Sequence, residues 1–364
     1  MKILFVFQDS SKSVYFESLT EGFLKKNVQV EALFFCKKGI LQQRIEQQGI
    51  ICHNYNIPQS GIVSKAFFNA RYIVQLSKKI GANGIFAHTV YANFYTALAS
   101  YFLPKVKVVC CRHNADEFYQ TNNKKAKRFD TLVNKIAPHL LVISEAAKRH
   151  VIAVEKVSPP KVSFLPLVYD FDKYDRYESC FVEPKKADTA LRIVTVSRLV
   201  DIKRIEQFFP VIQYFKAINK RIELHIIGDG PFENSLKQHV NALDIADLVT
   251  FLGHQENVIP HIKAADIVGH LSISESSNQV VKEAGYCGKT VIACKGVGDF
   301  DTYLNDDNAY LLDRHFTTDE VIKMIENTEG GNEKGENLKK IILEKFSLND
   351  ILLNQYIALF EPVV

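Results

Sequence analysis

Two cationic side chains stand five positions apart in a short loop in the second half of the chain. Arg198 and Lys203 follow the apolar run 192–197 and precede a helical pattern that begins near Arg204. Arginine offers a planar fork that matches phosphate oxygens, and lysine adds a mobile point charge. The positive end of a following helix strengthens the same field. The loop is a candidate phosphate site, although this pattern alone more often marks a solvated loop.

A second polar loop, residues 272–284 (SISESSNQVVKEA), follows an apolar run and leads into a helical pattern. Asn278 is a typical helix N-cap, with Ser277 as the alternative. The first turn of such a helix leaves backbone N–H groups from which a diphosphate can accept hydrogen bonds. The residues around that turn are Ser277, Asn278, Gln279 and Val280. The carboxylate of Glu283 can accept from both hydroxyls of a ribose, and Glu275 lies before the helix, on the loop.

A histidine ends one of the apolar runs in the first half of the chain. His113 stands between Arg112 and Asn114, at the end of residues 107–113. A histidine at a strand end is as often a satisfied core residue as a functional one. Because its neighbours make this loop unusually polar, we favour a functional role for His113. We leave the role of His88, which ends another run, open.

Such loops need strands that end at the same edge of a sheet. Apolar runs with little alternation recur along both halves and are separated by helix-length segments, as expected for parallel strands covered on both faces. The predicted strands are residues 2–8, 28–35, 84–88, 107–113, 140–144 and 162–166, and then 192–197, 223–228, 249–253, 267–272 and 290–294. Ligands of such sheets bind at the carboxyl ends of the strands.

The length of 364 residues favours two domains. We predict an α/β chain of two doubly wound, Rossmann-like domains that face each other across a cleft. Residues 1–170 form the first domain, residues 171–190 a polar linker, and residues 191–346 the second domain. An amphipathic C-terminal helix within residues 347–364 is expected to pack back on the first domain.

The bulk composition excludes several classes of protein. The chain has 45 basic and 41 acidic residues, a balance that does not favour nucleic acid. Seven cysteines without Cys-x-x-Cys spacing argue against a disulfide framework or a zinc site. No apolar run approaches the ~20 residues of a transmembrane helix, and the N-terminal run is too short for a signal peptide. We therefore expect a cytoplasmic protein.

One local cluster of charge stands out before an apolar stretch, at Lys124, Lys125, Lys127 and Arg128. A solvated helix face is the ordinary interpretation. The alternative is peripheral contact with anionic lipid headgroups at the inner face of the cell membrane.

Taken together, Arg-x4-Lys after one strand and Glu-x7-Glu after another resemble the signature of glycosyltransferase family 4, the glycosyl transferases group 1, whose fold is GT-B. Residues 223–231 (ELHIIGDGP), 249–253 (VTFLG) and 288–293 (GKTVIA) are similar to further segments of that family. The resemblance covers residues 190 to 315 well and residues 1 to 170 loosely.

The resemblance implies a retaining, metal-independent glycosyltransferase without a cofactor. Its donor would be a nucleotide-diphosphate sugar of UDP or GDP type, and its acceptor a saccharide or lipid-linked saccharide in bacterial glycan synthesis. Arg198 and Lys203 would neutralise the leaving diphosphate, and Glu283 would bind the ribose. Glu275 and His113 would contact the transferred sugar as catalytic residues, and the amides around 277–280 would hold phosphate or sugar.

The sequence departs from the family pattern in places. The loop Asp9–Ser13 lacks the family's paired glycines, and Ser276 and Ser277 follow Glu275 where Gly and Phe are usual. The acidic residue expected after Gly296-Val297 is matched approximately by Asp299 or Asp301. A sugar-nucleotide epimerase and a non-catalytic nucleotide-sugar-binding protein of the same fold are the alternatives.

Overall fold

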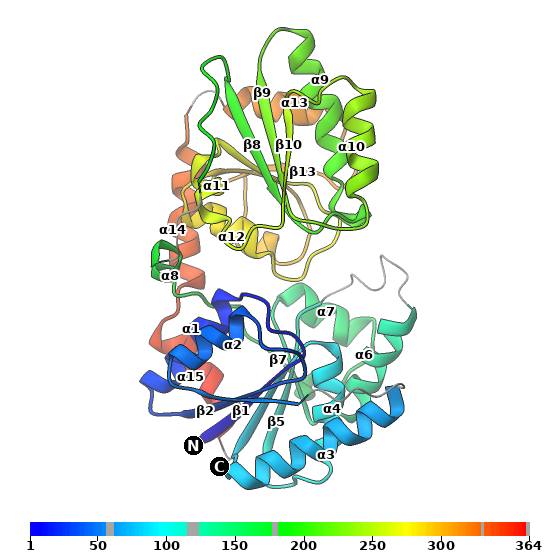
Figure 1. Cartoon of the computed structure of the whole chain (residues 1–364), viewed down its shortest axis with the longest axis vertical. Coiled ribbons are helices and arrows are strands. Elements are labelled where there is room, and N and C mark those ends of the chain that lie inside the picture. The colour runs from blue at the N-terminus through cyan, green and yellow to red at the C-terminus, as the bar shows by residue number, and fades with distance from the viewer. Residues whose placement is uncertain (56–61, 115–123, 177–180, 329–330, 362–364) are drawn as a thin grey trace. The chain divides into compact units, whose positions relative to one another are not determined.

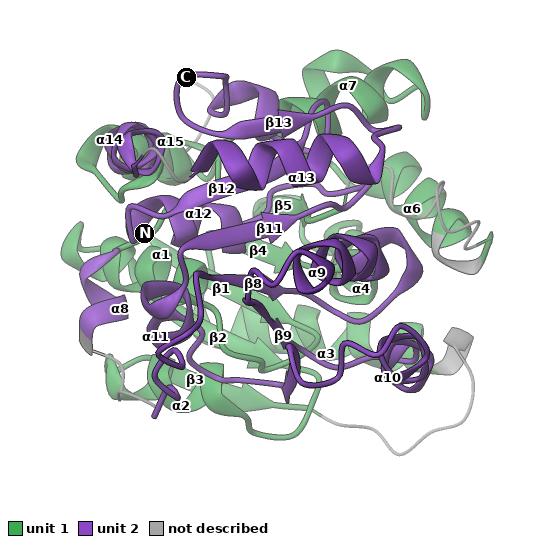
Figure 2. Cartoon of the chain, turned by 90° about the horizontal axis from the view of Figure 1, so that it is seen from above, with its two compact units in different colours: residues 1–170, 346–364 green, residues 171–345 purple. Residues whose placement is uncertain are grey.

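The computed structural model describes residues 1–55, 62–114, 124–176, 181–328 and 331–361 (Figure 1). The chain divides into two compact units (Figure 2). Unit 1 comprises residues 1–170 and 346–364, and unit 2 comprises residues 171–345. Each unit contains one sheet with helices packed on it, as the alternation of apolar runs and helical patterns predicts.

Unit 1 is built on a seven-stranded sheet in the order β3-β2-β1-β4-β5-β6-β7, in which all neighbouring strands are parallel. The strands are β1 (Lys2–Phe7), β2 (Gln29–Phe34), β3 (Ile51–Asn54), β4 (Gly84–His88), β5 (Lys107–Arg112), β6 (His139–Val142) and β7 (Val162–Phe164). All of β4 is buried, as are β1 and β5 after their first residues. Helices cover both faces of these central strands, which explains their unbroken apolar sequences (Figure 1).

Several helices of unit 1 begin at a polar side chain that caps them. They are α1 (Val14–Lys25), α2 (Ile40–Gln47), α3 (Ile62–Ile80), α4 (Val90–Ser100), α6 (Lys124–Ile136), α7 (Glu145–Ala153) and α15 (Asp350–Ala358). Ser13, Ser144 and Asn349 each accept a backbone N–H from the first turn of α1, α7 and α15. Such caps satisfy amides that have no partner inside the helix.

The last helix, α15, lies against unit 1. The hydroxyl of Tyr356 donates to the carbonyl oxygen of Pro166 at 2.8 Å and lies 3.3 Å from the hydroxyl of Tyr15. Phe360 packs so closely on Gly84 that a Cβ there would stand 2.5 Å from its ring. Tyr356 and Phe360 are both buried, so these apolar side chains are used inside unit 1.

Unit 2 is built on a six-stranded parallel sheet in the order β10-β9-β8-β11-β12-β13. Its strands are β8 (Leu191–Val196), β9 (Ile222–Ile227), β10 (Val249–Gly253), β11 (Ile267–His270), β12 (Thr290–Cys294) and β13 (Tyr310–Leu312). Its helices are α8 (Asp172–Arg176), α9 (Phe209–Ala217), α10 (Glu233–Ala242), α11 (Ile259–Ala264), α12 (Gln279–Tyr286), α13 (Thr318–Asn327) and α14 (Glu333–Phe346). The sheet order reverses between β8 and β11, which is where doubly wound sheets bind ligands.

The segment 171–190 is more than a polar connection, because its first residues fold onto unit 2. Phe171 and Tyr174 are buried, and the Phe171 ring stacks on Tyr286 with centroids 4.9 Å apart. The Tyr286 hydroxyl donates to Asp175 at 2.8 Å. These contacts place α8 on α12, a packing that the polar sequence of the segment does not indicate.

Two short edge strands also lack a clear sequence pattern. Strand β3 has exposed or half-buried side chains throughout, and β13 has three residues. Neither offers the continuous apolar run by which the central strands are recognised. Within the described ranges, no helix combines the length and apolar character that crossing a bilayer requires.

The turn after β9 fixes the loop after β8. Gly228 has a φ of +126°, and a Cβ on it would stand 1.9 Å from the carbonyl oxygen of Ser197. Gly230 would likewise bring a Cβ to 2.4 Å from the carbonyl oxygen of Leu199. The Gly-Asp-Gly sequence therefore permits two backbone loops to approach closely.

Replacing Gly228 by alanine should destabilise unit 2 by roughly 2–3 kcal/mol, because the clash adds to the strain of a positive φ. Gly253→Ala is the matched control, since Gly253 has a φ of +65° and no atom within 4 Å of the added Cβ. It should cost only about 1 kcal/mol. Urea-induced unfolding followed by circular dichroism measures both, and equal losses would contradict the close approach.

Candidate active site

The loop after β8 holds the first two predicted site residues. The backbone N–H of Leu199 donates to the carbonyl oxygen of Asp229 at 2.7 Å, which ties the loop to the turn after β9. Arg198 lies just before this tie with an exposed side chain, and Lys203 ends a short 3-10 turn and is half-buried. The two cations are therefore carried by an anchored backbone.

Lys203 meets the loop that follows β11. Its Nζ contacts Oε1 of Glu275, and Nε2 of His270 lies 2.7 Å from the same oxygen. The side-chain nitrogen of Asn278 lies 3.0 Å from that ring nitrogen. The structure thus brings both predicted segments together at the carboxyl edge of one sheet, and adds His270 at the end of β11.

The environment of Glu275 keeps it ionised. Burial by itself raises the pKa of this carboxyl, but the hydrogen bond and charge of His270 and the charge of Lys203 outweigh burial and lower it to about 2. Glu275 is therefore a carboxylate near neutral pH and not a proton donor. A fixed negative charge can stabilise positive charge that develops on a reacting sugar.

Helix α12 begins as the sequence predicts. Oδ1 of Asn278 accepts from the backbone N–H of Val281 at 2.8 Å, which confirms the predicted N-cap. Val280 lies in the first turn, where N–H groups have no partner inside the helix. Gln279 donates to Oε1 of Glu283 at 2.7 Å, and Glu283 is 3% exposed. The Glu283 carboxylate is thus buried and oriented from its own helix.

A buried ion pair that the sequence interpretation missed supports this loop. Nζ of Lys282 lies 2.6 Å from Oδ2 of Asp299 and 2.8 Å from Oγ of Ser277. Ser277 also donates to Asp299, at 2.7 Å. Burial lowers the pKa of Lys282, and the carboxylate of Asp299 opposes that change. The only signal in the sequence is a lysine set among apolar neighbours on α12.

The structure distinguishes the two acidic residues that follow Gly296, Asp299 and Asp301, by their contacts. Asp299 reaches the Ser277 loop through the contacts just described, whereas Oδ1 of Asp301 accepts from the backbone N–H of Gly296 at 2.8 Å. Asp301 therefore stabilises its own turn. Asp299 is the acidic residue that contacts the candidate site.

In unit 1, His113 follows β5 and pairs with the histidine that ends β4. Nε2 of His113 lies 3.1 Å from Nδ1 of His88. Burial lowers the pKa of His113 to about 4 and, with the charge of its neighbour, holds the pKa of His88 well below its usual value. Both rings are therefore neutral at pH 7. The fully buried His88, stacked on Phe7, holds the ring of His113 in place.

The polar neighbours of His113 anchor its loop. The guanidinium of Arg112 is 4% exposed, contacts Glu155 and lies 3.2 Å from Asp130. Its Nε donates to the carbonyl oxygen of Asn114 at 3.1 Å, and the Asn114 side chain donates to Asp130 at 2.9 Å. These residues fix the backbone on both sides of His113, so their polarity has a positioning role.

Among the described residues, His88, Cys111 and His113 place ligand atoms within 4.8 Å of one another, close enough to hold a metal ion. Burial raises the pKa of the Cys111 thiol well above its usual value. A metal ion bound here would have to displace that proton.

The glycine-free loop Asp9–Ser13 is held by its own side chains. Oγ of Ser10 accepts from the backbone N–H groups of Gly39 and Gln42, at 3.2 and 3.0 Å, and so caps α2 from another segment. Ser13 caps α1. The serines of this loop therefore fix two helix starts.

Replacing Glu275 by glutamine removes a charge that the native site favours. Because the pKa in the folded protein is about 2 against a usual 4.5, the stabilisation is present above about pH 4.5 and is lost as the pH falls toward 2. At neutral pH the variant should be less stable by on the order of 2 kcal/mol, with the difference shrinking below about pH 4.5. Thermal unfolding across pH measures it, with the exposed Glu326→Gln as control. A difference that does not change with pH would contradict the assignment.

Two family models match the chain. The model described as Glycosyltransferase Family 4 matches residues 13–173, and the model described as Glycosyl transferases group 1 matches residues 178–344. Among curated proteins, N-acetyl-alpha-D-glucosaminyl L-malate synthase of Bacillus anthracis is 29% identical over 177 residues, covering 47% of this chain and 45% of that protein. Poly(ribitol-phosphate) alpha-N-acetylglucosaminyltransferase of Staphylococcus aureus is 22% identical, covering 49% and 37%. The matched part thus spans less than half the length of these curated relatives.

Solved structures match over nearly the whole chain. HepE of Anabaena, in complex with UDP and glucose, has a TM-score of 0.78 at 21% identity and covers 98% of each chain. TarM of S. aureus, in complex with fondaparinux, alpha-GlcNAc-glycerol and UDP, has a TM-score of 0.73 at 14% identity and covers 100% of each. At this identity they establish the fold, two Rossmann-like units of GT-B type. With the family models spanning both units, the chain belongs to the glycosyl transferases group 1, glycosyltransferase family 4.

Proposed function

We propose that this chain is a retaining glycosyltransferase that moves a sugar from a nucleotide-diphosphate-sugar donor to a saccharide or lipid-linked saccharide acceptor. The observation that carries the proposal is the meeting of Lys203, Glu275 and the first turn of α12 at one edge of the unit 2 sheet. This arrangement offers cations, backbone N–H groups and a carboxylate to one small ligand.

In this proposal Arg198 and Lys203 act on the diphosphate. Charge builds on the diphosphate as the sugar leaves, and preorganised cations stabilise it without needing a metal ion. The Lys203 ammonium has three N–H donors, so it can keep its contact with Glu275 while it also donates to phosphate. The Arg198 guanidinium supplies a second, exposed cation five residues earlier.

The remaining residues are proposed to bind different parts of the donor. The amides around Ser277 to Val280 hold phosphate or sugar, and Glu283, oriented by Gln279, accepts from the ribose hydroxyls. Glu275 faces the transferred sugar as a permanent carboxylate. His113, the sugar-contacting residue proposed in unit 1, is a neutral ring at pH 7, which acts as a hydrogen-bonding group and not as a cation.

The donor is proposed to be of UDP type first and GDP type second, because the HepE and TarM structures hold UDP. The names of curated relatives include N-acetylglucosaminyl transfer, so UDP-N-acetylglucosamine is the first sugar donor to test. A role in bacterial glycan synthesis is part of the same proposal.

A thermal-shift panel of nucleoside diphosphates and their sugars tests the donor site. The correct nucleotide at about 100 times its dissociation constant should stabilise the protein by about 2.7 kcal/mol. Arg198→Ala should lose most of this shift, while Lys323→Ala, which removes an exposed cation of α13, should keep it. An unchanged shift in the Arg198 variant would exclude the proposed diphosphate site.

Transfer with retention predicts a definite product. With an α-linked donor, the new bond should also be α, which proton NMR of the product reports. An inverted product would refute retention, and turnover of the donor to a new sugar nucleotide without acceptor would favour the epimerase.

Lys203→Ala should lower kcat by about 10²–10³, because it removes a group that stabilises the leaving diphosphate.

A further inference from the structure

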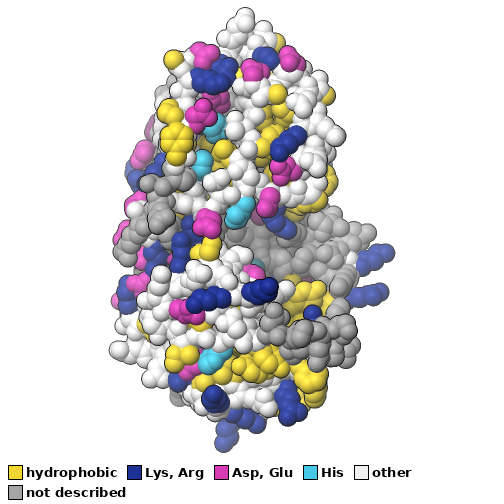
Figure 3. Space-filling view, viewed as in Figure 1, with side chains coloured by type: hydrophobic (Ala, Val, Ile, Leu, Met, Phe, Trp, Pro, Cys, Tyr) yellow, Lys and Arg dark blue, Asp and Glu magenta, His cyan; other side chains and the backbone are white. Residues whose placement is uncertain are grey.

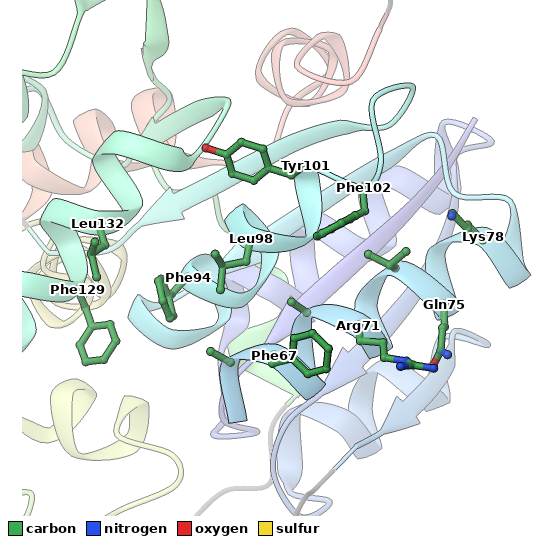
Figure 4. Close-up of a pocket in the computed structure, with 13 residues that line it drawn as sticks. Phe67, Arg71, Gln75, Lys78, Phe94, Leu98, Tyr101, Phe102, Phe129 and Leu132 are labelled. Carbon is green, nitrogen blue, oxygen red and sulfur yellow. The ribbon is translucent and has the colours of Figure 1, made fainter. Parts of the chain in front are cut away.

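An apolar groove lies on unit 1. It has a volume of about 1080 Å³ and is formed by α3, α4 and α6 (Figure 4). Side chains from all three helices line it, including Phe67, Phe94, Leu98, Phe129 and Leu132, and Phe102 lines it from just beyond α4. Phe94 and Leu98 also pack against the buried core, so the floor of the groove is the outer layer of that core.

The rim of the groove exposes unusually large apolar side chains. Phe67 is 61% exposed, Tyr101 66% and Phe102 68%. Figure 3 shows hydrophobic side chains gathered over α3 and α4, with lysine and arginine side chains beside them. Single exposed hydrophobic residues are ordinary, but a contiguous exposed patch around a groove is typical of a surface that binds a protein, a ligand or a membrane.

The charge around this groove has one sign. Helices α3 and α6 carry nine lysines and arginines between them, and neither α3 nor α4 contains an acidic residue. The one acidic residue of α6, Asp130, is buried and paired with Arg112. A chain with 45 basic and 41 acidic residues overall therefore concentrates cations on this face.

Two of these cations lie at the groove itself, and others lie on α6, which forms part of it. Arg71 and Lys78 line the groove itself and are exposed. Lys124 and Arg128 of α6 are exposed and Lys127 is half-buried, while the side chain of Lys125 lies outside the described residues. Exposed aromatic side chains with exposed cations beside them fit a surface whose interior is hydrocarbon and whose headgroups are anionic.

We propose that the α3–α4–α6 face docks on an anionic phospholipid bilayer, with Phe67, Tyr101 and Phe102 entering the headgroup and acyl boundary. The lysines and arginines of α3 and α6 would then contact lipid phosphates. Tyr356 of α15 and Phe360, just beyond it, have no such role, because both are buried in unit 1. This inference concerns unit 1 and goes beyond the proposed sugar transfer.

Co-sedimentation of the full chain with lipid vesicles tests the proposal. Vesicles of equal parts phosphatidylglycerol and phosphatidylcholine should bind the protein, and binding should weaken with salt. Vesicles of phosphatidylcholine alone should bind it at least tenfold more weakly. Equal binding to both kinds of vesicle, or to neither, would overturn the proposal.

Two variants separate the apolar and charged contributions. Tyr101→Ser with Phe102→Ser should lower partitioning at least tenfold, whereas Ile351→Ser, at a side chain 73% exposed on α15, should not change it. Arg71→Ala with Lys78→Ala should lower it about fivefold for each cation removed, since a basic residue near an anionic surface contributes about 1 kcal/mol. Lys237→Ala with Lys323→Ala is the charge control in unit 2.

Three further measurements keep the outcome decisive. Circular dichroism should give the same melting temperature for the exposed-site variants as for the natural chain, and all should keep the nucleotide shift of unit 2. Loss of vesicle binding with an intact nucleotide shift therefore concerns docking alone, and failure of the nucleotide test leaves docking standing. If sedimentation velocity instead shows self-association that Phe102→Ser abolishes, a second copy covers the groove and the bilayer is excluded.

Discussion

One contact between loops far apart in the sequence organises the candidate site, the ion pair of Lys203 with Glu275. Without a partner, the buried carboxylate of Glu275 would be strongly disfavoured, because burial raises its pKa. The lysine and His270 reverse that tendency, so the loop after β11 is stable only when the loop after β8 is folded beside it. The same pair leaves the ammonium with N–H donors to spare, so under the proposed function Lys203 can serve both as a structural link and as a phosphate ligand.

The backbone around this contact is held from several directions. Gly228 lets the turn after β9 support the loop after β8, and Asn278 starts α12. Beneath the Ser277 loop, Lys282 and Asp299 form an ion pair with almost no exposure. A buried pair of this kind contributes little net stability compared with apolar packing. Its effect here is to fix one conformation of the loop, which a site that positions a diphosphate requires.

The sequence predicts much of this arrangement, because the central strands are buried on both faces and are therefore visible in the sequence as apolar runs. The cap at Asn278 is also legible, since it depends on one side chain and its own first turn. The Lys282–Asp299 pair and the His88–His113 pair depend on residues brought together by the sheet order, and no local pattern encodes them. The sequence does not predict strand β3, because its half-exposed residues form no apolar run.

The groove on unit 1 shows where an apolar pattern alone misleads. Phe102 is a large apolar residue, yet α4 ends at Ser100 and Phe102 is exposed. Ala92, Ala97 and Tyr95 of α4 are buried in the core of unit 1, whereas Phe94 and Leu98 of the same helix line the groove. Since Phe94 and Leu98 link the groove to the core, hydrocarbon entering it would continue the same apolar packing that holds α4 on the sheet. The positive charge of α3 and α6 would then favour a hydrocarbon surface with anionic headgroups over one with neutral headgroups.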